Sequence, residues 1–312
     1  MTTNILFLST PKRWADYQAP LTRALESKGL KDFRLGEDLP AAEVDYIVYA
    51  PGGATDHDFT QFPRLKAVLS LWAGIETVIE NPSLTVPLAR MVDHGLTQGM
   101  MEWVTGHVLR HHLGMDAHIL GQNGIWEPVA PPLAQNRRVT ILGLGTLGTA
   151  CGQALATLGF PVTGWSRSPK SVSGITCLSG PEGLAQALST ADILVLLLPD
   201  TPATRDTLNA ETLAQLPRGA VVMNPGRGAL IDDAALLAAL DSGQIAHATL
   251  DAFRTEPLPS DDPYWSHPKV TVTPHIASET RVATASEVVA ENIRRGAAGE
   301  PLLHLVDRSL GY

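Results

Sequence analysis

Short runs of apolar residues alternate with amphipathic segments along most of the chain. In the first third, apolar runs predict buried strands within NILFLS, DYIVYA, KAVLSL and PLARMV. The segment WADYQAPLTRALESKG has the periodicity of a helix. Continuous apolar strands that alternate with helices are typical of parallel sheets covered on both faces. The pattern therefore predicts an α/β fold.

A change in composition marks a boundary before a second series of strands and helices. A long helical pattern from about Gln98 to Leu120 is followed by the Pro-rich, irregular segment GIWEPVAPPLAQNRR. From Arg138 onward, six predicted strands follow, within RVTILGLG, PVTGWSR, ADILVLLLP, AVVMNPGR, HATLDAF and VTVTPHIA. The closing helical pattern, SETRVATASEVVAENIRRGAAGE, can return the chain to the first domain. We therefore predict two doubly wound parallel-sheet domains, with residues 98–281 inserted between residues 1–97 and 282–312.

The first strand of the second series leads into a glycine-rich turn, VTILGLGTLG. Gly143, Gly145 and Gly148 have the G-x-G-x-x-G spacing, which allows a tight turn, close approach to a pyrophosphate and close helix packing. Thr146 and Leu147 would begin the helix whose N-terminus faces the phosphates. Because an apolar strand precedes the turn and an apolar helix follows it, we predict a Rossmann dinucleotide-binding domain.

The strand after this helix indicates which dinucleotide binds. An Asp or Glu usually stands at its end and binds the adenosine ribose, but here Ser166, Arg167 and Ser168 occupy this region, with Lys170 nearby. A guanidinium flanked by hydroxyls would attract the 2′-phosphate of NADP. The alternative is that Arg167 is a solvated surface charge. We predict NADP(H), preferred over NAD(H).

Four residues with side chains suited to catalysis follow the ends of the last three strands. Arg227 lies in NPGRG, Asp251 and Glu256 lie in LDAFRTEPLP, and His275 lies in VTPHIA. Reduction of a 2-keto acid needs a hydride donor, a proton donor and a cation for the carboxylate and the developing alkoxide. A histidine supported by a carboxylate is a suitable proton donor. These residues could together supply the cation and the proton donor that such chemistry requires.

The same segments resemble the D-isomer-specific 2-hydroxyacid dehydrogenases, most closely the glyoxylate/hydroxypyruvate reductase A branch. The similarity runs through GLGTLG, LLLPDTPATRDTLN, NPGRG, ALDSGQIAHATLDAFRTEPLP, VTVTPHIA and the terminal VDRSLGY. It implies a flavodoxin-like substrate domain formed by residues 1–97 and 282–312, beside the dinucleotide-binding domain at 98–281. It also implies a homodimer in which the segment from Glu127 to Gln135 could wrap around the partner.

The resemblance also implies a role for each catalytic candidate. Arg227 would bind the substrate carboxylate and polarise the keto oxygen, His275 would donate the proton, and Glu256 would raise the basicity of His275. Asp251 would contact the nicotinamide carboxamide, and Pro199 would line the adenosine side of the cofactor site.

In the first domain, SLWAGIE matches a loop that commonly has the sequence Gly-Ala-Gly in the family and binds the substrate carboxylate through its amides. Ala73 and Gly74 fit this role, whereas Trp72 replaces the first glycine. Its indole could form a wall of a pocket for small substrates or cap the core of the domain. Both interpretations remain open.

The resemblance thus implies an NADPH-dependent reductase of a small 2-keto acid, with glyoxylate and hydroxypyruvate as substrates. Two alternatives remain. The first is a dinucleotide-sensing binding protein on the same fold, because such proteins can keep the Arg, Glu and His set. The second is an NAD-dependent dehydrogenase that acts on another D-2-hydroxy acid.

Composition and charge narrow the possible partners. The net charge of −9 argues against nucleic acid or an anionic membrane as the main partner. The apolar runs are too short for a membrane span or a signal-peptide core, so we expect a cytoplasmic protein. Cys151 and Cys177 are interpreted as core residues of a reduced protein. His107 and His111 share a helix face without a further ligand at metal-binding spacing, so no metal site is predicted.

Overall fold

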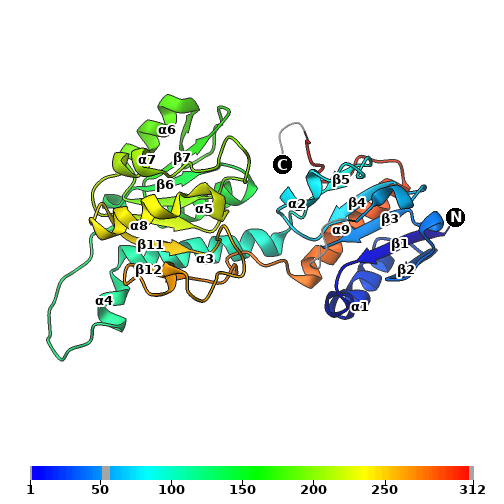
Figure 1. The fold of residues 1–312 in the computed structure, drawn as a ribbon, viewed down its shortest axis with the longest axis horizontal. Helices are drawn as coiled ribbons and strands as arrows, with labels where there is room; N and C mark the ends of the chain where they lie inside the picture. Colours follow the sequence, from blue (N-terminus) through cyan, green and yellow to red (C-terminus); the bar gives the residue numbers. More distant parts are fainter. Residues whose placement is uncertain (1, 51–56, 309–312) are drawn as a thin grey trace. The chain divides into compact units, whose positions relative to one another are not determined.

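The chain forms two compact units in the computed structural model, which describes residues 2–50 and 57–308 (Figure 1). Unit 1 comprises Met1–Leu96 and Thr280–Tyr312 and is discontinuous in sequence. Unit 2 comprises Thr97–Glu279. Each unit has its own sheet and its own apolar core.

Unit 1 is built on a parallel sheet. Over the described residues, this sheet has five strands in the order β2-β1-β3-β4-β5. The strands are β1 (Thr3–Leu8), β2 (Phe33–Gly36), β3 (Tyr46–Tyr49), β4 (Ala67–Ser70) and β5 (Leu88–Ala89). The apolar runs predicted four of these strands and missed β2. This strand lies at the edge of the sheet and is only partly buried, so its sequence, FRLG, has no continuous apolar run.

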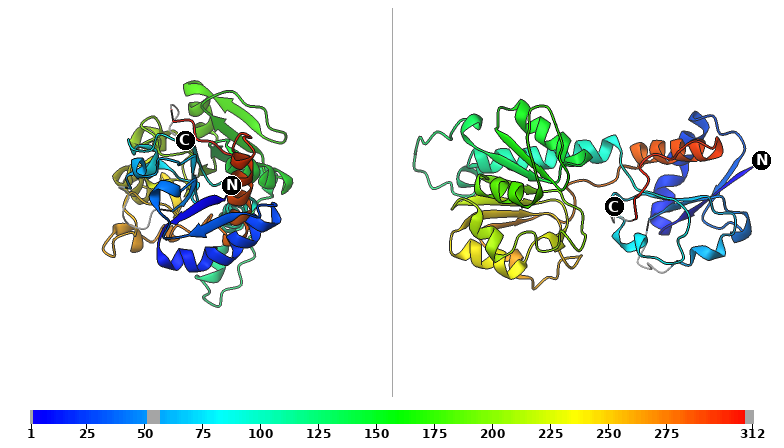
Figure 2. Two further views of the ribbon diagram at one scale, coloured as in Figure 1. Left: turned by 90° about the vertical axis from the view of Figure 1, so that its right-hand side faces the viewer. Right: turned by 90° about the horizontal axis from the view of Figure 1, so that it is seen from above.

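Helices α1 (Pro11–Ser27) and α9 (Val282–Ala297) lie side by side on one face of this sheet (Figure 2). Leu21 and Leu25 of α1 join Val289 and Ile293 of α9 in one buried cluster with strand residues such as Phe7. A second cluster on the other face includes α2 (Glu76–Ile79) through its buried Val78. The C-terminal part of the chain therefore belongs to the core of unit 1.

Unit 2 contains a larger parallel sheet. Within the described part of the chain, it has seven strands in the order β12-β11-β10-β9-β6-β7-β8. The strands are β6 (Val139–Leu142), β7 (Val162–Ser166), β8 (Thr176–Ser179), β9 (Ile193–Leu196), β10 (Ala220–Asn224), β11 (Ile245–Leu250) and β12 (Val270–Val272). The expectation of six strands was wrong by one. The additional strand, β8, is an edge strand whose sequence, TCLS, has only two apolar residues.

Helices cover both faces of the unit 2 sheet, as expected for a doubly wound fold. On one face, Val104 and Val108 of α3 and Leu155 of α5 pack on alternate strand residues. On the other face, α6, α7 and α8 contribute Leu188, Leu213, Leu236 and Leu240. The bounds are α3 (His94–His112), α5 (Thr146–Thr157), α6 (Gly180–Ser189), α7 (Ala210–Gln215) and α8 (Asp233–Asp241).

The helical pattern predicted from about Gln98 to Leu120 is interrupted in the structure. Helix α3 ends at His112, and α4 (Met115–Ile119) begins after Gly114, whose φ of 62° lies in the left-handed region. Glycine adopts this conformation without steric cost, so it separates the two helices. The Pro-rich segment that follows α4, called the arm here (residues 120–133), loops away from the rest of unit 2 (Figure 1).

Candidate active site

The candidate residues of unit 2 follow the carboxyl ends of its parallel strands. The chain runs from β6 outward to β7 and β8, and then from β9 on the other side of β6 outward to β12. Open α/β sheets bind ligands at such a switch point, outside the carboxyl ends of the strands. The candidates at or just beyond the carboxyl ends of β6, β7, β9, β10, β11 and β12 are Gly143, Ser166, Pro199, Arg227, Asp251 and His275. The fold therefore brings them to the same edge of one sheet.

The glycine-rich turn joins β6 to α5 with very little space around its backbone. Gly143 has a φ of 109°, and a Cβ atom there would lie 2.4 Å from the carbonyl oxygen of Leu197. A Cβ atom on Gly148 would lie 1.9 Å from the carbonyl oxygen of Gly143. At Gly145, by contrast, the position of a Cβ atom is open. Thr146 and Leu147 begin α5, so the turn fits a pyrophosphate held at the helix N-terminus.

The end of β7 forms a compact turn of hydroxyl-bearing and basic residues. Ser166 is buried, and its hydroxyl donates a hydrogen bond to the carbonyl oxygen of Ser168 at 2.9 Å. Arg167 and Ser168 are exposed, and the ammonium of Lys170 donates to the carbonyl oxygen of Leu144 in the glycine-rich turn. These residues therefore connect the region expected to bind ribose with the turn expected to bind pyrophosphate.

The loop after β10 presents Arg227. The side chain of Asn224 accepts a hydrogen bond from the amide of Gly226 at 3.1 Å and donates one to the carbonyl oxygen of Arg227 at 2.9 Å. The Arg227 guanidinium donates to the carbonyl oxygen of Gly226 at 2.8 Å. Because Asn224 is buried, it fixes the backbone from which Arg227 extends.

His275 and Glu256 form the expected pair. His275 Nδ1 lies 2.6 Å from Glu256 Oε2, and Glu256 Oε1 accepts a hydrogen bond from the amide of Phe253 at 2.8 Å. A carboxylate only accepts, so Nδ1 carries the donated proton and Nε2 remains for exchange with a substrate. His275 has a φ of 54°, which is uncommon for a residue with a side chain and is typical of strain at a functional site.

The electrostatics of the pair favour a protonated imidazole. The hydrogen bond to Glu256 raises the pKa of His275 above its ordinary value of 6.5, against the opposing effects of burial and of the Arg227 cation. Burial alone would raise the pKa of Glu256, but the hydrogen bonds from His275 and from the Phe253 amide lower it. An ionised Glu256 beside a cationic His275 is the arrangement that a general acid requires.

Asp251 holds the segment that carries His275. Its side chain is fully buried. One carboxylate oxygen accepts from the hydroxyl of Thr273 at 2.5 Å and from the amide of Ile276 at 2.9 Å, and the other accepts from the amide of Ala277 at 2.9 Å. These three bonds surround His275 in sequence, so Asp251 fixes the backbone turn that carries His275. The contact with a carboxamide expected from the resemblance stays a prediction.

The candidate substrate loop of unit 1 follows β4. The hydroxyl of Ser70 accepts from the amide of Trp72 at 3.0 Å, and the amide of Met91 donates to the carbonyl oxygen of Trp72 at 2.9 Å. The indole packs against the apolar cluster of unit 1, and the Arg13 guanidinium lies 5.2 Å from its ring centroid. Trp72 therefore caps this core. Whether it also contacts substrate with Ala73 and Gly74 stays a prediction.

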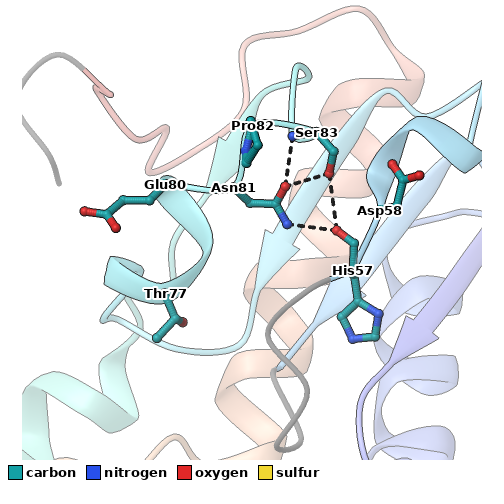
Figure 3. A pocket seen from close by; sticks show the side chains of 7 residues that line it. All are labelled: His57, Asp58, Thr77, Glu80, Asn81, Pro82 and Ser83. Atoms are coloured by element: carbon teal, nitrogen blue, oxygen red, sulfur yellow. Dashed lines mark hydrogen bonds between the residues drawn. The ribbon is translucent and has the colours of Figure 1, made fainter.

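A pocket of about 450 Å³ in unit 1 contains none of the predicted site residues (Figure 3). The side-chain amide of Asn81 and the hydroxyl of Ser83 both donate to the carbonyl oxygen of His57, at 2.8 and 3.2 Å. The hydroxyl and the amide of Ser83 also contact the side-chain oxygen of Asn81. The polar groups of this turn thus bind one another, and the pocket gives no evidence of a ligand site.

The histidines of α3 contact residues of unit 2. His111 Nε2 lies 2.8 Å from the hydroxyl of Thr249, and the ring of His107 lies 4.4 Å from that of Trp103 between centroids. Burial lowers the pKa of His111 to about 3, so the imidazole is neutral near pH 7. Across the residues that the structure describes, no three His, Cys, Asp or Glu side chains form a metal-ligating group. Cys151 and Cys177 are free thiols.

Two residues of this edge were not singled out in the sequence. A Cβ atom on Gly228 would lie 2.0 Å from the carbonyl carbon of Phe253, so the loop after β10 touches the loop after β11 backbone to backbone. Arg254 contacts Ile231, Asp206 and Asp233 in neighbouring segments of unit 2. The position of Gly228 directly after Arg227 hinted at a close approach, whereas nothing distinguished Arg254 from a surface charge.

Comparison with known proteins places the chain among related enzymes. The family model described as D-isomer specific 2-hydroxyacid dehydrogenase, NAD binding domain, matches residues 105–277. The glyoxylate/hydroxypyruvate reductase A of Serratia proteamaculans (strain 568) is 38% identical over 99% of this chain and 100% of its own length.

Solved structures extend the similarity to both units. A D-isomer-specific 2-hydroxyacid dehydrogenase of Xanthobacter autotrophicus Py2, in complex with NADPH and MES, has a TM-score of 0.88 and 40% identity over 98% of this chain and 99% of its own. An NADPH-dependent glyoxylate/hydroxypyruvate reductase of Sinorhizobium meliloti, in complex with NADP and sulfate, has a TM-score of 0.87 and 35% identity over 99% and 100%. The chain belongs to the D-isomer-specific 2-hydroxyacid dehydrogenase family.

Proposed function

We propose that the protein reduces a small 2-keto acid, glyoxylate or hydroxypyruvate, to the 2-hydroxy acid with NADPH. The observation that carries this proposal is the 2.6 Å contact between Glu256 and His275, at the sheet edge that also presents Arg227 and the glycine-rich turn. Relatives that are 35–38% identical over at least 99% of this chain are named for this activity.

The glycine-rich turn suits NADPH binding, since Gly145 leaves open space beside the N-terminus of α5. Gly143, Gly145, Thr146, Leu147 and Gly148 would hold the pyrophosphate through backbone groups. Bound NADPH supplies the hydride. Pro199 would line the adenosine side of the cofactor site. Asp251 would bind the nicotinamide carboxamide in addition to the backbone amides around His275.

The choice of NADP(H) over NAD(H) rests on the end of β7. Ser166, Arg167, Ser168 and Lys170 occupy the region where NAD-binding domains usually have a carboxylate. Arg167 would bind the 2′-phosphate through charge-assisted hydrogen bonds, with the hydroxyl of Ser168 and the ammonium of Lys170 nearby. Buried Ser166 would shape the turn.

Three side chains would share the catalytic work: the cations of Arg227 and His275 and the carboxylate of Glu256. Arg227 would bind the substrate carboxylate with its planar fork and stabilise the charge that develops on the keto oxygen. His275 would transfer the proton of Nε2 to that oxygen while Glu256 stabilises the imidazolium. The backbone of Ala73 and Gly74 would also bind the carboxylate, with Trp72 limiting the size of the substrate.

We also propose a cytoplasmic homodimer, with residues 1–97 and 282–312 as substrate domain and 98–281 as dinucleotide-binding domain. The arm and α4 expose several large apolar side chains: Ile119, Leu120, Ile125, Trp126, Val129 and Leu133. Trp126 is 93% exposed, and a second copy of the chain would cover this surface. Analytical ultracentrifugation tests the proposed dimer, since a monomer at micromolar concentration would contradict it.

No helix among the described residues is long and apolar enough to cross a membrane.

The test of function is a panel assay. Purified protein is mixed with NADPH or NADH and with glyoxylate, hydroxypyruvate, pyruvate or larger 2-keto acids, and nicotinamide absorbance is followed. We expect turnover with the first two acids and a preference for NADPH. Tight NADPH binding without turnover of any acid would instead support a dinucleotide-sensing protein, and efficient turnover with NADH alone would support an NAD-dependent dehydrogenase.

A further inference from the structure

Arg254 connects the loop that carries Glu256 to two neighbouring segments of unit 2. Its Nε donates a hydrogen bond to the carbonyl oxygen of Ile231 at 3.1 Å and lies 3.3 Å from Asp233 Oδ2. Its Nη2 forms an ion pair with Asp206. A guanidinium can satisfy several acceptors at once because its five donors lie in one rigid plane.

The segments that Arg254 contacts belong to the surroundings of Arg227. Ile231 and Asp233 lie four and six residues beyond Arg227 in the chain. The amide of Asp206 donates to the carbonyl oxygen of Ala229 at 2.9 Å, so Asp206 is itself attached to this segment. Asp233 also accepts from the hydroxyl of Tyr264 at 2.9 Å. Arg254 thus lies in a polar network around the loop after β10.

The same two loops meet through their backbones. A Cβ atom on Gly228 would lie 2.2 Å from the amide nitrogen of Arg254, in addition to its close approach to Phe253. The Phe253 amide in turn donates to Glu256 Oε1 at 2.8 Å. A displacement of Phe253 and Arg254 away from Gly228 would therefore move an amide that holds the Glu256 carboxylate.

We propose that Arg254 is a positioning residue that holds the loop of Glu256 against the loop of Arg227 and so keeps the Glu256 carboxylate on His275 Nδ1. The relevance of this role to catalysis rests on the proposed function, in which His275 donates the proton. The contrary view is that Arg254, whose side chain is 38% exposed, forms surface ion pairs of little consequence.

The direction in which the pKa of His275 changes when Arg254 is replaced separates these views. The charged groups that act on the His275 imidazole are Glu256, Arg227 and Asp251. If replacement of Arg254 only removed a distant positive charge, the pKa of His275 would rise or stay unchanged. If it loosened the contact with Glu256, the pKa would fall, because the hydrogen bond to Glu256 is the largest influence that raises it.

The experiment is an NMR titration of the His275 ring in the full-length protein, with the signal assigned by comparison with a His275→Gln variant. We expect Arg254→Ala to lower the pKa of His275 toward 6.5, and Arg254→Lys to restore part of the difference. The matched control is Arg138→Ala. It removes an arginine whose Nη2 pairs with Asp192 at 2.7 Å at the amino ends of the central strands β6 and β9, and it should leave the titration of His275 unchanged.

Kinetics add a second readout. With NADPH and glyoxylate, Arg254→Ala should lower kcat/KM by about 10-fold near pH 8, since small misplacements of catalytic groups are costly. The KM for NADPH should be retained. If Arg254→Ala does not fold, Arg254→Gln keeps a polar side chain while it removes the cation that pairs with Asp206 and Asp233, so the same direction of the pKa change separates the two views. An unchanged or raised pKa of His275 in a folded variant would overturn the proposal. Because the titration needs no substrate, a wild-type protein without turnover would refute the function and leave the positioning role to be decided by NMR.

Discussion

Replacement of Glu256 by glutamine tests the proposed proton transfer most directly. The carboxylate accepts two hydrogen bonds, one from His275 Nδ1 at 2.6 Å and one from the Phe253 amide at 2.8 Å, through different oxygens. An amide of the same shape has a single acceptor oxygen, so one of these donors would face an NH₂ group. The substitution also removes the negative charge that stabilises the imidazolium.

The structure sets the size of the expected effect. A hydrogen bond to a charged group contributes about 1.5–3 kcal/mol. Since the side chains of His275 and Glu256 are 47% and 35% exposed, solvent screening favours the lower part of this range. A loss of about 1.5–2 kcal/mol corresponds to a rate decrease of roughly 10- to 30-fold.

The sign of the pH dependence follows from the protonation state of His275 that each direction of the reaction requires. In the proposed mechanism reduction needs protonated His275, so the rate of reduction is high below the pKa of His275 and falls as the pH rises through it. Without the Glu256 carboxylate this pKa falls, because burial and the Arg227 cation then act unopposed by it. Reduction by Glu256→Gln should therefore fail at lower pH than reduction by the wild type. Oxidation of the 2-hydroxy acid needs neutral His275 and should extend to lower pH.

Steady-state kinetics from pH 5.5 to 9 in both directions would provide the assay. The control is Glu211→Gln, the same substitution at an exposed position in the first turn of α7. An equal loss at every pH and in both directions would refute the reasoning, since a general defect in folding or binding has no such asymmetry.

Three further predictions concern single side chains. Arg167→Ala should weaken the binding of NADPH by about 1.5–3 kcal/mol and that of NADH much less. Isothermal calorimetry with both cofactors measures this, and equal weakening of both would argue against recognition of the 2′-phosphate. His275→Gln should cut turnover by ~100-fold or more with NADPH binding nearly intact, and a parallel collapse of binding would make the residue structural. Arg227→Lys keeps the positive charge but loses the planar guanidinium that can form two parallel hydrogen bonds with a carboxylate. It should therefore raise the KM for glyoxylate and lower turnover, and it should reduce the turnover of an uncharged aldehyde less. Equal proportional losses for both substrates would contradict a contact with the carboxylate.

Hydrophobic patterning predicted the buried strands better than the edges of the two sheets. Central strands such as β6 and β9 are buried on both faces, so their sequences, VTIL and ILVL, are largely apolar. The edge strands β2 and β8 have one side without a partner strand and need no such run. Helix continuity was overestimated beyond His112, because a glycine within an apolar pattern can either be tolerated in a helix or end it. Gly114 ends it.

At the site, spacing along the chain predicted which side chains reach the edge of the sheet but not how they contact one another. That Arg227, Asp251 and His275 follow successive strand ends is visible in the sequence, since parallel strands share one carboxyl edge. The orientation of Glu256 depends on its contact with the Phe253 amide, which has no signature in residue types. It also depends on the close approach of Gly228 to Phe253, and the glycine beside Arg227 does not reveal which segment it approaches. The role of Arg254 is hidden for the same reason, because its three partners lie between 21 and 48 residues away in the sequence.

Two carboxylates support His275 in different ways, and burial explains the division. Asp251 is fully buried and accepts three hydrogen bonds from Thr273, Ile276 and Ala277, so it stabilises a backbone turn in which His275 has a positive φ. Glu256 is partly exposed and contacts the imidazole itself, where an ionised group can respond to the arrival and departure of a proton. Asp251 and Glu256 could not exchange these roles. A carboxylate that accepts three backbone and hydroxyl hydrogen bonds cannot move when the imidazole gains or loses a proton, and a partly solvated carboxylate would hold a strained turn less firmly. Asp251 thus fixes the backbone geometry of His275, and Glu256 stabilises the positive charge of its imidazole.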